Sequence, residues 1–306
     1  MKQIDRCPCC NGTDLDVLPA AIAPFIIDYV VHDPAHTLCG FCVCRACAFR
    51  FFDARFEPAE IARLYEDYRG DAYFQARHRH EFWYRRTTND QVGSGPALVA
   101  LRKRIMASLL VRVIDTNKVE SILDYGGDRG QFLPDALGRS RWVYEVSGVL
   151  PVPGVRSIAS EADLGGRYFD VVALSNVLEH APDVLDMLLR VRALTTPGTG
   201  VVYLEVPDEH FDLRFASRGR AYRRTLGFLA RNPSAFRWVD LYSALFRIKL
   251  RVIPPFGVLR AHEHINFFSE PSLRRLLARG GLTVLACVRN PAPYRAWLVV
   301  ARADSG

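Results

Sequence analysis

Apolar and polar positions alternate along the chain with two different periods. Strand-length apolar runs contain Leu123, Trp142-Val143-Tyr144 and Cys287. Helical spacing of apolar residues occurs at 57–65, where Pro58 stands near the start, at 97–113 and within 209–260. These patterns predict a chain that contains both strands and amphipathic helices.

The segment after Leu123 combines residues typical of a cofactor-binding turn. Asp124 ends the apolar run, three glycines follow within six residues, and a helix is expected to begin near Gln131. Glycine allows the backbone to pass close to a ligand, and a helix start offers unpaired N–H groups. Glu145, 21 residues after Asp124, is placed to accept ribose hydroxyls. The pattern predicts a site for a nucleotide-type cofactor, although its spacing does not match a dinucleotide-binding turn.

This stretch resembles the first motif of class I S-adenosylmethionine-dependent methyltransferases, Asp/Glu-x-Gly-x-Gly-x-Gly. Asp124, Gly126 and Gly130 match the motif, and Asp128 replaces its middle glycine. Asp tolerates left-handed backbone angles, so we expect the turn to survive. The resemblance implies an α/β, Rossmann-like fold with a mostly parallel seven-stranded sheet and S-adenosylmethionine as the methyl donor.

Downstream segments extend the resemblance over about 190 residues, at 168–180, 197–207 and 264–301. The first of them includes Leu178-Glu179-His180, as in many small-molecule methyltransferases. The cofactor-binding residues implied by the matched positions are Asp124, Gly126, Gly127, Asp128, Gly130, Glu145, Asp163, Ser175 and Asn176.

Seven of the eight cysteines lie within residues 7–47, which favours a metal site over disulfides in a reducing compartment. Two Cys-x-x-Cys pairs can place four thiolates around a structural zinc ion, which leaves no open coordination position. We prefer Cys7, Cys10, Cys44 and Cys47, because the second pair with its tail resembles a zinc-binding front domain of some bacterial methyltransferases. Cys9 and the pair Cys39 and Cys42 remain alternatives.

A length of 306 residues predicts more than one domain. We expect a zinc-binding domain at 1–56, a helical linker that caps the cofactor cleft at 57–114, and the methyltransferase domain at 115–306 with a helical insertion at about 209–260. The N-terminus lacks an apolar signal core, and no apolar run is long enough to span a bilayer. We therefore expect a cytoplasmic protein.

The insertion accounts for the positive charge of the whole chain. It holds ten Arg and one Lys against three acids, a net of about +8, whereas the formal charge of the chain is +7. Arginine pairs well with phosphates, so we expect an anionic small-molecule acceptor such as a nucleotide sugar. Peripheral membrane contact through this segment is a competing interpretation, RNA binding is a weaker one, and no DNA partner is expected. The oligomeric state is left open.

A methyl acceptor that loses a proton requires a base with a pKa near neutrality, which histidine provides. The candidates are His264, Glu263 and His180. The segment 262–269 resembles the Glu-His-x-x-Phe/Tyr-Phe-Ser signature of methyltransferases that act on sugars, which favours His264 with Glu263 beside it. The function implied is methylation of a sugar, a nucleotide-linked sugar or a surface-glycan precursor in polysaccharide biosynthesis. The alternatives are a zinc-containing RNA methyltransferase and a non-catalytic binding protein with a degenerate core.

Overall fold

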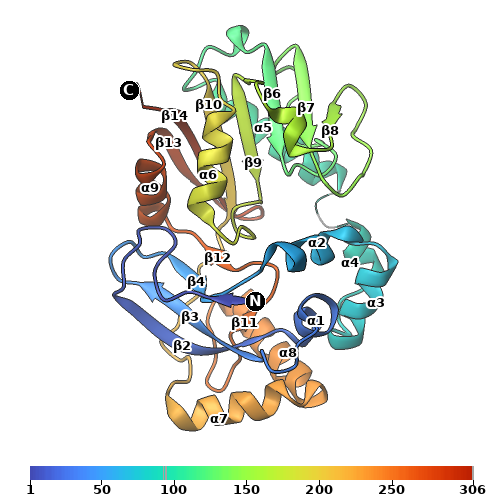
Figure 1. Ribbon diagram of the computed structural model, residues 1–306, viewed down its shortest axis with the longest axis vertical. Coiled ribbons are helices and arrows are strands. Elements are labelled where there is room, and N and C mark those ends of the chain that lie inside the picture. The colour runs from blue at the N-terminus through green and yellow to red at the C-terminus, as the bar shows by residue number, and fades with distance from the viewer. Residues whose placement is uncertain (92, 94, 305–306) are drawn as a thin grey trace. The chain divides into compact units, whose positions relative to one another are not determined.

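The computed structural model describes residues 1–91, 93 and 95–304. Its chain forms two compact units (Figure 1). Unit 1 comprises Met1–Cys7, Asn11–Asp90 and Glu209–Phe268, and unit 2 comprises Pro8–Cys10, Gln91–Asp208 and Ser269–Gly306. This division differs from the expected segments 1–56, 57–114 and 115–306, because the insertion joins the N-terminal part of the chain in one unit.

Strand pairing explains why the insertion belongs to unit 1. The N-terminal part forms an antiparallel meander of β2 (Leu15–Ile22), β3 (Leu38–Cys44) and β4 (Arg50–Phe52). The segment that includes the insertion and continues to Phe268 adds β11 (Arg260–Ala261) parallel to β2 and β12 (Asn266–Phe267) antiparallel to β4. Both edges of the three-stranded meander are thereby paired, which satisfies backbone groups that an edge strand leaves exposed.

The helices of unit 1 surround an aromatic core that includes Phe25, Phe41, Phe52 and Tyr73. The remaining elements of the unit are β1 (Lys2–Gln3), β5 (Ala54–Arg55), α1 (Pro24–Ile26), the π-helix η1 (Ile27–Val31), α2 (Pro58–Glu66), α3 (Asp71–His80), α4 (Arg86–Gln91), α7 (Gly219–Ala230) and α8 (Pro233–Leu250). Within the described part of the chain, no helix combines the length and the hydropathy that crossing a membrane requires.

A buried ionic network connects the insertion to α3. Glu81, at the end of α3, accepts hydrogen bonds from Arg260 and from Arg77 Nε at 3.1 Å, and lies 3.0 Å from His262 Nε2. Arg260 also pairs with Asp240 of α8 at 3.0 Å. Burial opposes ionisation of Glu81, but Arg260 and His262 outweigh it and hold the pKa of Glu81 well below its usual range. Glu81 is therefore ionised although it is buried, with Arg260 as its buried counter-charge.

Unit 2 contains the expected seven-stranded, mostly parallel sheet, in the order β13-β14-β10-β9-β6-β7-β8. The five neighbouring strands β10, β9, β6, β7 and β8 pair in parallel. Strand β14 runs antiparallel to both of its neighbours, β10 and β13. The strands are β6 (Ser121–Tyr125), β7 (Ser140–Tyr144), β8 (Arg156–Ile158), β9 (Val171–Ser175), β10 (Val201–Pro207), β13 (Leu282–Asn290) and β14 (Ala296–Ala303).

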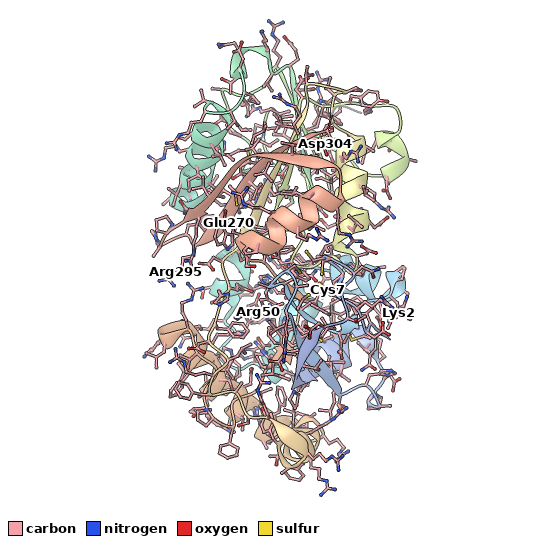
Figure 2. All side chains as sticks on the ribbon, turned by 90° about the vertical axis from the view of Figure 1, so that its left-hand side faces the viewer. Lys2, Cys7, Arg50, Glu270, Arg295 and Asp304 are labelled. Atoms are coloured by element: carbon pink, nitrogen blue, oxygen red, sulfur yellow. The ribbon has the colours of Figure 1, made fainter. Side chains whose placement is uncertain are left out.

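Helices cover both faces of this sheet (Figure 1). Met106 and Leu110 of α5 (Pro96–Leu110) pack with Val171 and Ala173 of β9 on one face. The alternate residues of β9 point to the other face, where α6 (Val184–Ala193) and α9 (Glu270–Arg279) lie. Figure 2 shows α9 across the end of the sheet, with Glu270 at its start. Two short 3-10 turns, η2 (Thr116–Lys118) and η3 (Glu161–Leu164), complete the unit.

We expect Glu81→Gln to lower the free energy of unfolding by about 3–5 kcal/mol, because Arg260 and Arg77 would lose their buried counter-charge. Urea denaturation followed by circular dichroism measures the change. The control is Asp16→Asn, which breaks the more exposed pair with Arg218 and should cost less than about 1 kcal/mol. Equal losses in the two variants would show that the buried network does not stabilise unit 1.

Candidate functional site

The turn after β6 adopts the backbone conformations that its residues allow. Gly126, Asp128 and Gly130 have φ of +70°, +55° and +68°. Asp128 therefore stands in the left-handed conformation expected at the position of the missing glycine. Gly127 is required for another reason: a Cβ atom there would lie 2.1 Å from Asp124 Cγ. The turn thus wraps closely around the Asp124 side chain.

The helix expected to begin near Gln131 does not form. Residues 126–139 run through successive turns before β7 begins at Ser140. Pro134 lacks an N–H and its ring would clash with a helical carbonyl four residues earlier, while Gly138 has φ of +74°. The prediction of a helix N-terminus at this site was wrong. The charged groups of the site are therefore side chains and not the N–H groups of a helix start.

Asp124 is a fully buried carboxylate at the carboxyl end of β6. Neither of its oxygens has a hydrogen-bond partner among the described residues. The pKa of Asp124 is raised to about 7, chiefly by burial, which Arg102 opposes and which Glu205, Asp128 and Glu145 reinforce. A buried carboxylate without a donor is costly, so the site favours a ligand that brings a cation or N–H donors.

Glu145 follows β7, the strand next to β6. Its carboxylate accepts the backbone N–H of Asp128 at 3.2 Å and that of Ser147 at 2.9 Å. A carboxylate has about four acceptor positions, so both oxygens retain capacity for ligand hydroxyls. Asp163 is exposed in η3, where it interacts with Ser160 Oγ at 3.0 Å. Asp124 lies at the carboxyl end of β6, and Glu145 and Asp163 follow the carboxyl ends of β7 and β8. All three residues are therefore at the same edge of the parallel sheet.

Ser175 and Asn176 stand at the carboxyl end of β9, the other neighbour of β6. Ser175 Oγ and Asn176 Oδ1 are buried and have no hydrogen-bond partner among the described residues. Asn176 has φ of +61°, an uncommon conformation that Asn tolerates. Ligands of open α/β sheets bind beyond the carboxyl ends of such strands, so these oxygens are available where a cofactor would lie.

Sequence reasoning missed the buried pair of Arg102 and Glu205 at this end of the sheet. Arg102 of α5 pairs with Glu205 of β10 and lies 3.4 Å from the centre of the Phe132 ring. Glu205 also accepts hydrogen bonds from Tyr294 and, at 3.0 Å, from Tyr203. The signal that could have revealed them is charge inside apolar patterns, because Arg102 and Glu205 interrupt an otherwise apolar helix face and strand.

These side chains fit S-adenosylmethionine. Asp124 offers a buried negative charge to its ammonium group, and Glu145 offers carboxylate oxygens to its ribose diol. The turn of residues 126–130 lets the backbone approach the ligand without Cβ atoms at its three glycines. The carboxylate of Asp128 accepts a hydrogen bond from Gln131 Nε2 at 3.0 Å within the same turn.

The candidate catalytic base His264 lies in unit 1. Its Nδ1 is 2.9 Å from Glu209 Oε2, and both side chains are partly exposed. A carboxylate on one ring nitrogen fixes the tautomer and leaves the other nitrogen to accept a proton. Sequence reasoning proposed His264 but not Glu209.

The other two candidates have different surroundings. Glu263 is buried, and its carboxylate accepts a hydrogen bond from Tyr73 and lies 3.4 Å from Arg77 Nη1. His180 lies in unit 2, after the carboxyl end of β9, and its backbone N–H donates to Val177 O at 3.0 Å. The Glu263 carboxylate is therefore engaged by Tyr73 and Arg77 in the interior of unit 1. His180 belongs to unit 2, which contains the cofactor site.

Four cysteines gather near the N-terminus. The sulfur atoms of Cys7, Cys10, Cys44 and Cys47 all lie within 4.8 Å of one another, and those of Cys7 and Cys47 are 3.6 Å apart. Tetrahedral zinc with Zn–S bonds of about 2.3 Å separates its sulfurs by about 3.8 Å, so this donor set fits zinc. The alternatives lie elsewhere: Cys39 packs in the aromatic core, and Cys9 Sγ donates to Ser272 O at 3.2 Å.

Comparisons with known proteins agree with this fold. Residues 98–286, more than half of the chain, match the family described as "Methyltransferase domain". No curated protein matches the sequence.

Similar solved structures include three bacterial methyltransferases. An O-methyltransferase family protein from Burkholderia thailandensis is 15% identical, with 76% of this chain and 63% of that chain covered and a TM-score of 0.40. The 1,6-didemethyltoxoflavin-N1-methyltransferase of the same organism is 20% identical, with 84% and 95% covered and a TM-score of 0.48. Magnesium protoporphyrin IX methyltransferase from Synechocystis PCC 6803 is 12% identical, with 67% and 83% covered and a TM-score of 0.42. The family match establishes that the chain belongs to the methyltransferase-domain family, with a class I S-adenosylmethionine-dependent core.

Proposed function

We propose that this protein transfers the methyl group of S-adenosylmethionine to a small-molecule acceptor. The observation that carries the proposal is the buried carboxylate of Asp124, which has no hydrogen-bond partner among the described residues and stands at the carboxyl end of a central strand. Such a group favours a ligand with a cation or N–H donors, and the donor carries an ammonium group as well as its sulfonium.

The bound donor supplies an activated methyl group, so the protein has to bind it, orient it and exclude water. Asp124 holds the methionyl end and Glu145 holds the ribose hydroxyls. Arg102 and Glu205 position this end of the sheet, since their pair lies buried below the turn with Tyr294. Ser175 Oγ and Asn176 Oδ1 complete the polar lining.

We assign proton removal from the acceptor to His264. The Glu209 carboxylate at its Nδ1 orients the ring and stabilises the imidazolium that forms when Nε2 accepts a proton. Glu263 acts as a positioning residue for the adjacent backbone through Tyr73 and Arg77. His180 remains a candidate on the cofactor unit.

We further propose an anionic sugar, a nucleotide-linked sugar or a surface-glycan precursor as the acceptor, in cytoplasmic polysaccharide biosynthesis. Support comes from the resemblance of residues 262–269 to methyltransferases that act on sugars and from the arginines of the insertion. We also propose that Cys7, Cys10, Cys44 and Cys47 bind a structural zinc ion, as their mutual distances permit.

We expect Asp124→Asn to abolish cofactor binding and yet to stabilise the cofactor-free protein at pH 8. The folded pKa of Asp124, about 7, exceeds that of an unfolded Asp, so stability is lost as pH rises from about 4 through 7. The variant should regain roughly 2–4 kcal/mol at pH 8 and almost nothing at pH 4. Thermal unfolding and calorimetry with S-adenosylhomocysteine measure both effects. Unchanged cofactor affinity would refute the role of Asp124.

His264→Asn should lower turnover at least about 100-fold, because it removes the base, while cofactor affinity stays within a few fold. Labelled donor with a panel of nucleotide sugars, lipid-linked glycans and total RNA reports turnover by mass. The matched control is His36→Asn, which removes an exposed histidine that also pairs with a carboxylate, Asp33, at 2.7 Å. Full activity of His264→Asn would exclude it as the base, and methylation of RNA alone would refute the sugar acceptor.

Purified protein should contain about one zinc ion per chain by atomic emission. Cys44→Ser should lose the metal because a hydroxyl is a poor replacement for a thiolate ligand. Cys42→Ser, a substitution on the same strand, should retain it, since Cys42 lies outside the four-cysteine cluster. Loss of zinc from Cys42→Ser but not from Cys44→Ser would contradict the assignment.

A further inference from the structure

Helix α8 is amphipathic in the reverse of the usual sense. Its outward face carries large apolar side chains: Trp238 is 61% exposed, Leu245 47% and Ile248 75%. Its buried residues are one apolar side chain, Phe236, and the polar residues Asp240 and Ser243. A surface helix of a globular protein normally turns its apolar stripe inward.

The inward polar residues have structural partners. Asp240 pairs with the buried Arg260, and Ser243 Oγ accepts the N–H of Val258 at 2.7 Å and donates to Val239 O at 2.6 Å. The fold of unit 1 therefore accounts for the inner face of α8. On the outer face, Trp238 packs against Phe82, with ring centres 5.2 Å apart, whereas the largely exposed side chains of Leu245 and Ile248 have no such role in the fold.

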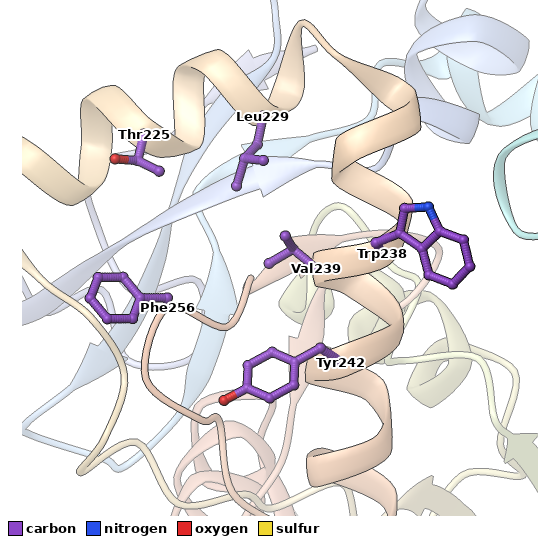
Figure 3. A pocket seen from close by; sticks show the side chains of 6 residues that line it. All are labelled: Thr225, Leu229, Trp238, Val239, Tyr242 and Phe256. Carbon is purple, nitrogen blue, oxygen red and sulfur yellow. The ribbon is translucent and has the colours of Figure 1, made fainter.

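The apolar surface continues from α8 across to α7. A pocket of about 390 Å³ opens between the two helices and is lined by Thr225, Leu229, Trp238, Val239, Tyr242 and Phe256 (Figure 3). Phe256 is 70% exposed and has φ of +57°, a conformation that is rare for an aromatic residue. Exposed apolar area of this kind marks a site of interaction with a protein or a membrane.

Charge distinguishes between these partners. The exposed face of α7 presents Arg220, Arg223 and Arg224, and α8 ends with the exposed Lys249. Within the described residues, none of these four side chains forms an ion pair with an acid. A second copy of the chain would bring the same positive charge to the contact, whereas an anionic surface would neutralise it.

We propose that α7 and α8 form a membrane-binding face that lies on an anionic lipid bilayer. Trp238, Leu245 and Ile248 insert at the level of the headgroups, and the arginines of α7 pair with lipid phosphates. The helices lie in the plane of the interface and do not span it. This proposal is independent of methyl transfer, since none of these residues belongs to the cofactor site.

Vesicle sedimentation of the full-length protein tests the proposal. Binding is expected to vesicles of phosphatidylcholine with 30% phosphatidylglycerol, and at least tenfold less to phosphatidylcholine alone. Leu245→Ser with Ile248→Ser should reduce binding to the anionic vesicles at least tenfold, because both side chains are already exposed and leave the core intact. Arg223→Gln with Arg224→Gln should reduce it severalfold and weaken its dependence on salt.

Matched controls change the same residue types elsewhere. Val111→Ser with Leu189→Ser, both exposed in unit 2, and Arg104→Gln with Arg275→Gln should bind like the unaltered protein. Brominated lipid should quench Trp238, so Trp238→Phe should lose quenching that Trp142→Phe retains. Equal binding by the Leu245/Ile248 variant and its control would overturn the proposal. So would a dimer in analytical ultracentrifugation that this variant dissociates, since a second copy would then cover the face.

Discussion

The site depends on one electrostatic constraint, a carboxylate held out of water without a donor. Asp124 is enclosed by its own strand and by a turn in which Gly127 has no Cβ to displace it. The protein pays for this in stability when the carboxylate ionises, and its raised pKa expresses that cost. A cationic ligand relieves this penalty. The affinity for such a ligand and the lower stability of the ligand-free protein therefore have the same origin, the buried charge of Asp124.

A second constraint organises unit 1. The insertion begins and ends far from the N-terminus in sequence, but its strands β11 and β12 pair with β2 and β4. The buried charges of Glu81, Arg260 and Asp240 then join α3, β11 and α8. Because α8 faces this network with Asp240 and Ser243, Trp238, Leu245 and Ile248 are left on its outside, where they form the surface that we assign to a membrane.

Much of the cofactor unit could be predicted because its signals are local. A strand followed by Asp124 and glycines, with Glu145 after the next strand, shows the type and order of elements. The helix expected after the turn does not form, because Pro134 lacks an N–H and its ring clashes with a helical backbone. The pairing of Glu209 with His264 and that of Arg102 with Glu205 could not be predicted, since the partners are distant in sequence and meet only on folding.

The sequence by itself determined which cysteines have metal-ligand spacing, and its short-range motifs carried the family resemblance that implied the α/β class and the mostly parallel sheet. Only the tertiary structure decided that residues 209–268 complete the N-terminal sheet, that Asp124 lacks a partner among the described residues, and that α8 exposes its apolar face. Helical periodicity states that two faces differ, but which face is buried depends on what packs against it.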